Sequence, residues 1–366
     1  MHKRIAINIP LIAAVLFLAL LGLVMQYSAS SYTALKETGD AFFYVKKQAV
    51  ALVVGIVAAI AASRMPLEWL RKWSLVLLIF SCVLLAAVFI PGLGVSKYGA
   101  TRWLNLGFTT FQPSELAKFA LPVFIASRLT VKSAHTFRNM IAILIATLAV
   151  CGLIMLEPNM SITMCVGLVV MILLFVGGCR LKQFAVMALP AVGGVIALIF
   201  MEPYRLKRLM AFLDPWASPL GEGYQLIQSY YALGSGGWFG VGLFQSRQKY
   251  AFLPFAESDF IFSVIGEELG WIGCILVMAV FGIIVWQGIR IAMRATTRFE
   301  SYLACGIVAV IAVQTLLNIA VVSGSIPPTG LPLPFVSAGG SSLVVFLTAV
   351  GILLNIDRRT EKPDRS

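Results

Sequence analysis

The 366-residue chain is too apolar to fold as a water-soluble protein, since hydrophobic residues make up 60% and charged residues only 12%. Soluble domains carry roughly 25% charged residues, and the mean hydropathy here is +0.92. The net charge of +12 would suit nucleic acid, but much of the Lys and Arg lies in short loops between apolar runs, where it sets membrane topology. We therefore exclude a nucleic-acid partner and predict an all-α polytopic membrane protein.

Apolar runs of about 20 residues, the length that crosses a bilayer, recur about ten times. They lie near residues 8–28, 45–63, 74–90, 113–129, 139–156, 159–178, 183–201, 260–289, 302–324 and 338–356. The first run could be a cleaved signal peptide, but its apolar core is long for one and no soluble domain follows it. We interpret it as a span and treat residues 1–366 as a single integral membrane domain.

Basic residues mark alternating ends of these runs, which predicts that those ends are cytoplasmic. They are Lys3, Arg4, Arg64, Arg71, Lys72, Arg128, Lys132, Arg138, Arg180, Lys182, Arg290, Arg294, Arg298, Arg358, Arg359, Lys362 and Arg365. Both termini are then expected inside the cell, with residues 357–366 as a short cytoplasmic tail. The protein is expected in the cytoplasmic (inner) membrane.

The outward loops include two long ones, 91–112 and 202–258. The second lies between spans 7 and 8 and contains a Gly-rich run at 234–242. Loops of this length are usually functional or carry structure of their own. We expect short helices and a binding role there.

Cysteine and histidine chemistry is not indicated. The chain has six cysteines and two histidines, the cysteines lie in or beside apolar runs, and none shows C-x-x-C spacing. Neither a disulfide framework nor a zinc site is predicted.

Carboxylates gather at residues 254–270, where Glu257, Asp259, Glu267 and Glu268 open a long apolar run. Acidic groups are costly near hydrocarbon and usually mark functional sites. At an outward membrane surface an ionised Asp259 could act as a general base on a sugar hydroxyl. The alternative is that Glu257, Ser258 and Asp259 only cap the helix.

Two further segments carry polar groups at span ends. Glu115 and Lys118 are three residues apart, so they share a helix face, either as a plain ion pair or as part of a cavity wall. Four prolines at 327–334 prevent a helix before the last span. Residues 339–341 could then offer backbone amides to an anion such as pyrophosphate, or the segment could be a rigid turn without a ligand.

Long motifs from one end of the chain to the other resemble those of the SEDS family (shape, elongation, division and sporulation). The matching segments are 25–30, 99–104, 112–118 (Q-P-S-E-x-x-K), 223–242, 246–249, 259–270 (D-F-I-F…G-E-E-L-G) and 327–342 (P-P-T-G-x-P-x-P-F-x-S-x-G-G-S-S). Within that family the chain is more similar to the FtsW/SpoVE branch than to RodA.

The resemblance implies a peptidoglycan glycosyltransferase that polymerises lipid II at the outer face of the cytoplasmic membrane, in cell division or a related cell-wall process. It implies that Asp259 is the essential carboxylate, that Glu115 and Lys118 are its cavity partners, and that Arg102 and Trp103 are the family's arginine and tryptophan. It also implies a class B penicillin-binding protein, a transpeptidase, as partner, together with other membrane proteins of the division or elongation complex.

Three segments depart from the family pattern. Relatives usually read P-E-x-H-T-D before the helix, whereas residues 254–259 lack the early Glu and the His, which Glu257 could partly replace. Residues 157–162 read E-P-N-M-S-I where Q-P-D-x-G-T is usual, so that a carboxylate moves two positions, to Glu157. Ala338 stands where Tyr is usual.

The hypothesis is an inverting glycosyl transfer in which Asp259 takes the proton of the acceptor hydroxyl. Lys118, Arg102 and Arg247 are candidates to offset the developing phosphate charge. The residues expected to bind or support the substrate are Glu115, Lys118, Arg102, Trp103, Arg247, Lys249, Glu257, Ser337, Gly339, Gly340 and Ser341. No cofactor is required; a divalent cation, Mg or Mn, is the alternative, and no carboxylate cluster predicts protein ligands for it.

Two other functions fit a polar cavity. A transporter that flips a lipid-linked precursor predicts an inward-open route and tolerance of Asp259→Asn. A non-catalytic division scaffold predicts that the cavity charges are dispensable.

Overall fold

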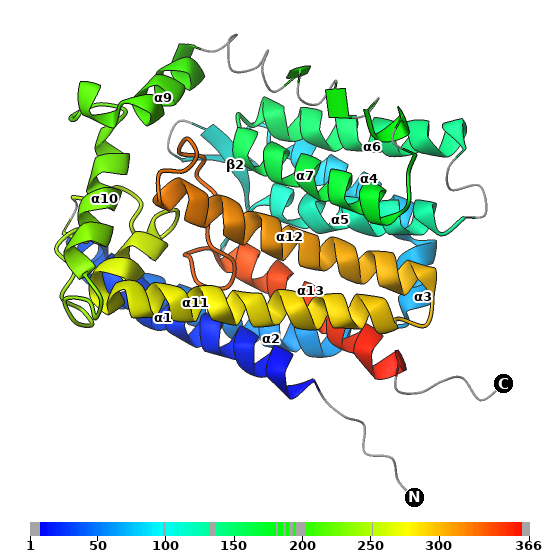
Figure 1. Cartoon of the computed structure of the whole chain (residues 1–366), viewed down its shortest axis with the longest axis horizontal. Coiled ribbons are helices and arrows are strands. Elements are labelled where there is room, and N and C mark those ends of the chain that lie inside the picture. Colours follow the sequence, from blue (N-terminus) through cyan, green and yellow to red (C-terminus); the bar gives the residue numbers. More distant parts are fainter. Residues whose placement is uncertain are drawn as a thin grey trace, which may run out of the picture.

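The computed structural model describes residues 8–97, 100–107, 109–131, 136–180, 182–185, 188–189, 193–194, 203–250 and 252–360. These residues form a bundle of long helices that run side by side, with a helical cover at one end (Figure 1). The main helices are α1 (Ile9–Thr38), α2 (Phe43–Ala62), α4 (Ser74–Ala87), α5 (Pro113–Leu129), α6 (Phe137–Leu156), α7 (Met160–Val176), α11 (Ile261–Arg294), α12 (Arg298–Val322) and α13 (Gly340–Thr360). A short helix, α3 (Leu67–Lys72), precedes α4.

Each of these main helices matches a predicted span. Six of them, within the described part of the chain, are long and apolar enough to cross a membrane, and α4 and α7 are shorter apolar helices. The predicted span 183–201 falls largely outside the described residues, so the number of ten spans stays a prediction. The polytopic helical membrane fold is confirmed.

The loop 91–112 departs from the all-α expectation. It forms a three-stranded antiparallel sheet of β1 (Gly94–Lys97), β2 (Ala100–Asn105) and β3 (Thr110–Phe111), in the order β1-β2-β3. Gly94 pairs with Leu104, which pairs with Phe111. Such short strands depend on cross-strand pairing rather than on local propensity, so sequence pattern alone does not predict them.

The loop 202–258 contains the short helices that we predicted. They are α9 (Pro203–Leu213), the 3-10 turn η1 (Pro215–Ala217) and α10 (Tyr224–Gly236). α9 and α10 cover one end of the bundle, whereas α1 begins and α13 ends at the opposite end (Figure 1). Both ends of the described chain therefore lie away from this cover.

Helix α11 is broken at Gly270, and the Gly-rich run repairs the break. Gly270 has φ 68° and ψ −167°, a conformation that only glycine adopts readily. The amide of Trp271 donates to the carbonyl of Gly237 at 2.9 Å, and the amide of Val241 donates to the carbonyl of Glu267 at 2.9 Å. A Cβ on Gly240 would lie 2.1 Å from the carbonyl oxygen of Glu268. The glycines of this run allow close backbone approach, which is a structural role; the binding role expected of the loop 202–258 stays a prediction.

Helices α5 and α12 occupy the centre of the bundle. The side chains of Ala117, Leu121 and Ile125 on α5, and of Leu303 and Ile311 on α12, are fully buried. Because α5 begins at the covered end and runs through the core, its first turn presents polar side chains inside the protein rather than to lipid.

Candidate active site

A cavity of about 2020 Å³ lies beneath the cover. Its volume exceeds that of ordinary small-molecule pockets, roughly 300–1,000 Å³, so it has room for an extended substrate or for two. The residues discussed below that line it are Gln48, Arg102, Trp103, Gln112, Glu115, Pro158, Arg208, Glu257, Ser258, Asp259, Pro328, Gly330, Gly339, Gly340, Ser341 and Ser342.

Asp259 lies on this cavity, in the turn before α11. The N-cap of α11 is Phe260, and no side chain caps the helix, which rules out the simple capping alternative. The hydroxyl of Ser258 donates to Oδ1 of Asp259 at 2.8 Å. The second oxygen, Oδ2, lies beside Gly330. The carboxylate therefore borders the cavity and accepts a hydrogen bond from Ser258.

The backbone around Asp259 is held by a row of hydrogen bonds. The carbonyl of Glu257 accepts from the amide of Ala338 at 2.9 Å, and that of Ser258 accepts from the hydroxyl of Ser337 at 2.5 Å. The carbonyl of Asp259 itself accepts from Nδ2 of Asn318 at 2.8 Å. Because successive carbonyls are fixed by α12 and by the loop before α13, the carboxylate is preorganised.

Opposing effects act on the charge of Asp259. Burial raises the pKa of the Asp259 carboxyl, whereas the Ser258 hydrogen bond and the positive charges of Arg102 and Arg208 lower it, with a net rise. Burial also raises the pKa of Glu257, and the charges of Asp259 and Glu37 add to that rise. Of the two, Asp259 is the carboxylate that cations support in its ionised form.

Gly330→Ala tests the packing against Asp259. Gly330 has φ 72°, and an added Cβ would lie 3.2 Å from Oδ2 of Asp259. We expect a loss of about 1–2 kcal/mol in the free energy of unfolding, from the left-handed backbone, and an additional loss of activity because the carboxylate is displaced. Gly92→Ala is the control, since Gly92 has φ 87° and no neighbour within 4 Å of an added Cβ. Thermal unfolding and turnover of both variants check this; an equal activity in the two would contradict it.

Glu115 and Lys118 form a buried ion pair, with Nζ of Lys118 2.9 Å from Oε1 of Glu115. Lys118 also donates to Oε1 of Gln314 at 2.5 Å, and the hydroxyl of Ser342 donates to Oε2 of Glu115 at 2.8 Å. Glu115 lines the cavity, whereas Lys118, 1% exposed, lies behind it. Lys118 is thus a partner of Glu115, as the resemblance implied, and its role toward a phosphate stays a prediction.

The segment predicted to offer backbone amides borders the cavity, and its binding of an anion stays a prediction. Gly339, Gly340 and Ser341 are on the cavity surface at the start of α13. The amide of Gly339 donates to Oε1 of Gln48 at 3.2 Å. Ser337, by contrast, is buried and supports the Asp259 loop rather than the cavity surface.

Arg102 and Trp103 come from β2 and line the cavity. Nε of Arg102 donates to the carbonyl of Glu157 at 3.0 Å, and Nη2 donates to that of Pro158 at 2.6 Å. These bonds to the α6–α7 turn fix the guanidinium at the cavity wall.

The displaced carboxylate of Glu157 is buried, and neither of its oxygens has a hydrogen-bond partner among the described residues. Burial raises the pKa of Glu157 to about 8, and the charge of Arg102 opposes this rise. The native state therefore holds the proton more tightly than the unfolded chain.

Glu157→Gln is expected to remove a pH dependence of stability. Since the folded pKa is the higher one, the wild-type contribution is fully present below about pH 4.5 and is lost as pH rises towards about 8. A tenfold change in proton affinity is about 1.4 kcal/mol, so the loss is a few kcal/mol. Thermal unfolding between pH 5 and 8 measures it, with the exposed Glu68→Gln as control. A wild-type slope that persists in Glu157→Gln would contradict the prediction.

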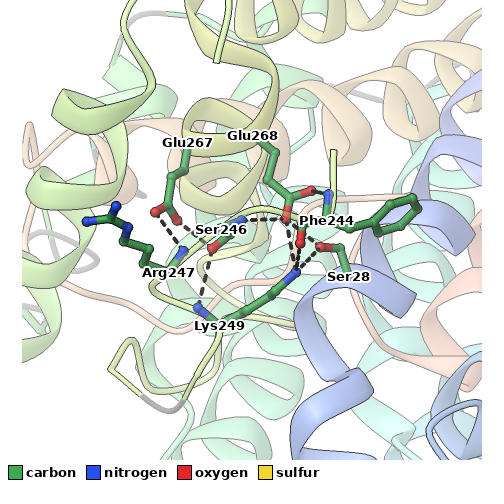
Figure 2. Close-up of polar contacts among 7 residues, drawn as sticks. All are labelled: Ser28, Phe244, Ser246, Arg247, Lys249, Glu267 and Glu268. Carbon is green, nitrogen blue, oxygen red and sulfur yellow. Dashed lines mark hydrogen bonds and ion pairs between the residues drawn. The ribbon is translucent and has the colours of Figure 1, made fainter. Parts of the chain in front are cut away.

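Arg247 and Lys249 lie away from the cavity, in a cluster around Glu267 and Glu268 (Figure 2). Nζ of Lys249 is 3.6 Å from Oε1 of Glu268, and it donates to the carbonyl of Phe244 at 2.5 Å. The backbone amide of Arg247 donates to Oε1 of Glu267 at 2.9 Å, while its guanidinium points away from the cluster (Figure 2). The cluster ties segment 244–249 to α11, and neither residue lines the cavity, so their role in substrate binding stays a prediction.

Sequence reasoning missed four polar residues of the site: Gln48, Arg208, Gln314 and Asn318. Nδ2 of Asn318 donates to the carbonyls of both Asp259 and Leu331. Nε2 of Gln314 donates to the carbonyl of Pro332 at 2.8 Å. Three of the four are polar side chains within apolar spans, a signal that could have found them. Arg208 is on α9, in the cover, where no such signal exists.

The chain matches, over residues 9–362, the family model for FtsW, RodA and SpoVE that is described as "Cell cycle protein". It is 40% identical over 360 residues to stage V sporulation protein E of Bacillus subtilis, covering 97% of this chain and 98% of that protein. It is 42% identical over 356 residues to a probable peptidoglycan glycosyltransferase FtsW of Trichlorobacter lovleyi, covering 95% and 92%. The chain belongs to the FtsW/RodA/SpoVE family, as its motifs indicated.

Solved structures agree with this assignment. A chain from a peptidoglycan synthase complex, described for the coordination of polymerization and crosslinking, superposes with a TM-score of 0.81 at 28% identity, covering 98% of this chain and 99% of that one. The rod shape determining protein RodA of Thermus thermophilus superposes with a TM-score of 0.71 at 25% identity, with the same coverage. The protein is a multi-pass membrane protein with the RodA fold.

Proposed function

We propose that this protein is a peptidoglycan glycosyltransferase that polymerises lipid II into glycan strands at the outer face of the cytoplasmic membrane. The main observation behind this proposal is Asp259, a preorganised carboxylate at the wall of a large cavity. The charges of Arg102 and Arg208 act to lower its pKa. Relatives that align with almost the whole chain are named as probable peptidoglycan glycosyltransferases.

Asp259 is the general base of this proposal. It takes the proton from the 4-hydroxyl of the acceptor sugar as that oxygen attacks the anomeric carbon of the donor. The bond from the anomeric carbon to the lipid pyrophosphate breaks, and the configuration inverts. Pyrophosphate leaves as a stabilised anion, so no second residue is needed to protonate it.

Arg102 and Arg208 are assigned to offset the charge that develops on the phosphate. Both line the cavity, whereas Lys118 and Arg247 do not. A Mg or Mn ion is the alternative. Among the described residues, no three His, Cys, Asp or Glu side chains lie close enough together to hold a metal ion. Such an ion would therefore be held largely by the substrate. Turnover measured with and without a chelator distinguishes charge compensation by the arginines from charge compensation by a divalent cation.

Arg208→Gln is expected to move the acid limb of the pH profile of kcat/KM to higher pH. The positive charge of Arg208 lowers the pKa of Asp259, so its removal raises that pKa and a higher pH is needed to ionise the base. Arg247→Gln, an exposed cation outside the cavity, should leave the profile in place. If the acid limb of the kcat/KM profile of Arg208→Gln is unchanged or moves to lower pH, Asp259 is not the titrating base.

The proposed partner is a class B penicillin-binding protein, a transpeptidase, within a complex of division or elongation membrane proteins. A structural neighbour belongs to a peptidoglycan synthase complex. Arginines at the bundle end opposite the cavity, such as Arg71 and Arg290, support cytoplasmic termini and an outward cavity in the inner membrane.

The test is glycan-strand formation from lipid II by the purified protein, alone and with its transpeptidase. Polymer from the wild type supports the proposal. Translocation of a lipid-linked precursor without polymer would favour the transporter, and neither activity with the partner present would favour the scaffold.

A further inference from the structure

A second cavity, of about 540 Å³, lies at the other end of the bundle, between α4, α5 and α6. Its walls include Ile79 and Val83 from α4, Phe124 from α5, and Ala146 and Ala149 from α6. α5 begins at the Asp259 cavity and is 17 residues long, so its last turn is roughly 25 Å away. This groove, which we call the α4–α6 groove, is separate from the candidate active site.

The groove is open to the surface that faces lipid. Ile79 and Val83 are 53% and 58% exposed, so they are bordered by acyl chains when the protein is in a membrane. On α6 the small side chains of Ala142, Ala146 and Ala149 line the inner wall, and they leave space that larger side chains would fill. An apolar channel in this position suits a single hydrocarbon chain.

One residue of the lining is charged. Arg128, in the last turn of α5, lies at the end of the groove, and its guanidinium is 5.1 Å from the ring centre of Phe124. Among the described residues no acidic side chain forms an ion pair with Arg128. A half-buried cation that shares its groove only with apolar side chains favours an anion as ligand.

The surroundings of Arg128 are basic as well. Nδ2 of Asn139 donates to the carbonyl of Arg128 at 3.0 Å, which brings the neighbouring Arg138 to the same end of the groove. The carbonyl of Arg71 accepts from the hydroxyl of Ser127 at 3.5 Å. In a membrane, exposed basic residues near the surface add a less specific attraction for anionic lipids.

We propose that the α4–α6 groove binds an anionic phospholipid, with one acyl chain between α4 and α6 and the phosphate on Arg128. The apolar lining of the groove, its exposure to lipid and its single cation all fit this ligand. The site goes beyond the proposed function, because it shares no residue with the Asp259 cavity.

The experiment titrates the purified full-length protein with phosphatidylglycerol or phosphatidylcholine and counts bound lipid by native mass spectrometry. For the wild type we expect roughly tenfold tighter binding of phosphatidylglycerol, as for one charge-assisted pair. In Arg128→Gln the affinities for the two lipids should differ by no more than about twofold. The remaining difference comes from the weaker attraction of Arg71 and Arg138 for the anionic lipid. Arg138→Gln, which removes an exposed charge at the same end, is the control and should keep the preference.

Ala149→Leu narrows the groove and leaves Arg128 in place, so it tests the acyl-chain site even if Arg128→Gln fails to fold. It should weaken phosphatidylglycerol binding. The proposal is overturned if the wild type binds both lipids equally, if Arg138→Gln loses as much preference as Arg128→Gln, or if Ala149→Leu binds as the wild type does.

Discussion

Asp259→Asn is expected to lower glycan-strand synthesis by roughly 10²–10⁴-fold, the usual contribution of a general base. The amide keeps the shape of the side chain and can still accept from Ser258, but it cannot take the proton of the acceptor hydroxyl. The backbone bonds from Asn318 and Ser337 remain, so the variant should fold. Polymerisation of lipid II by wild type and variant, at matched protein, measures the effect.

Asp214→Asn is the matched control for this substitution. Asp214 caps η1 by accepting from the amides of Trp216 and Ala217, a task that Asn performs equally well, and it does not line the cavity. It should keep wild-type activity. Equal polymer from Asp259→Asn and the wild type would remove Asp259 as the base and direct attention to Glu257 or Glu115.

Lys118→Met is expected to lower the free energy of unfolding by about 3–5 kcal/mol. Glu115 is 1% exposed, and removing its partner leaves an uncompensated charge inside the protein. The double variant Glu115→Gln with Lys118→Met should recover most of the loss, because the charge is then gone as well. Thermal unfolding of the single and double variants in one detergent checks this.

A double variant as unstable as Lys118→Met would mean that Lys118 acts mainly through Gln314 or through its packing on Phe346, 5.1 Å from Nζ to the ring centre. Glu115→Gln alone should also be destabilising, since it leaves the buried charge of Lys118 with the neutral Gln314 as its hydrogen-bond partner.

The helices were predictable from sequence because each apolar run has the length of a membrane span. Asp259, Glu115 and Arg102 were predictable for a related reason: a charged side chain beside such a run stands out from its surroundings. Both signals are local, so sequence alone carries them. The family resemblance then added the activity.

Other features depend on partners far away in the chain. Sequence alone made Arg247 a candidate for the phosphate charge and Lys249 a candidate for substrate binding. Only the fold brings Lys249 beside Glu268 and the backbone of Arg247 beside Glu267. Whether Lys118 faces the cavity or lies behind Glu115 depends on α12, which supplies Gln314. The small sheet and the pairing of the Gly-rich run with α11 are likewise non-local.

The repaired break in α11 ties one part of the cover to the bundle through backbone hydrogen bonds. Residues 237–242 complete the backbone hydrogen bonds of α11, so that stretch cannot lift without unravelling the helix. Among the described residues, α9 makes side-chain contacts through Arg208, which lies 3.9 Å from Glu222 and donates to the carbonyl of Pro328 at 3.4 Å. Any movement of α9 relative to residues 237–242 would therefore change the distance from Arg208 to Asp259. Because the charge of Arg208 lowers the pKa of Asp259, such a movement would also change the proton affinity of the proposed base.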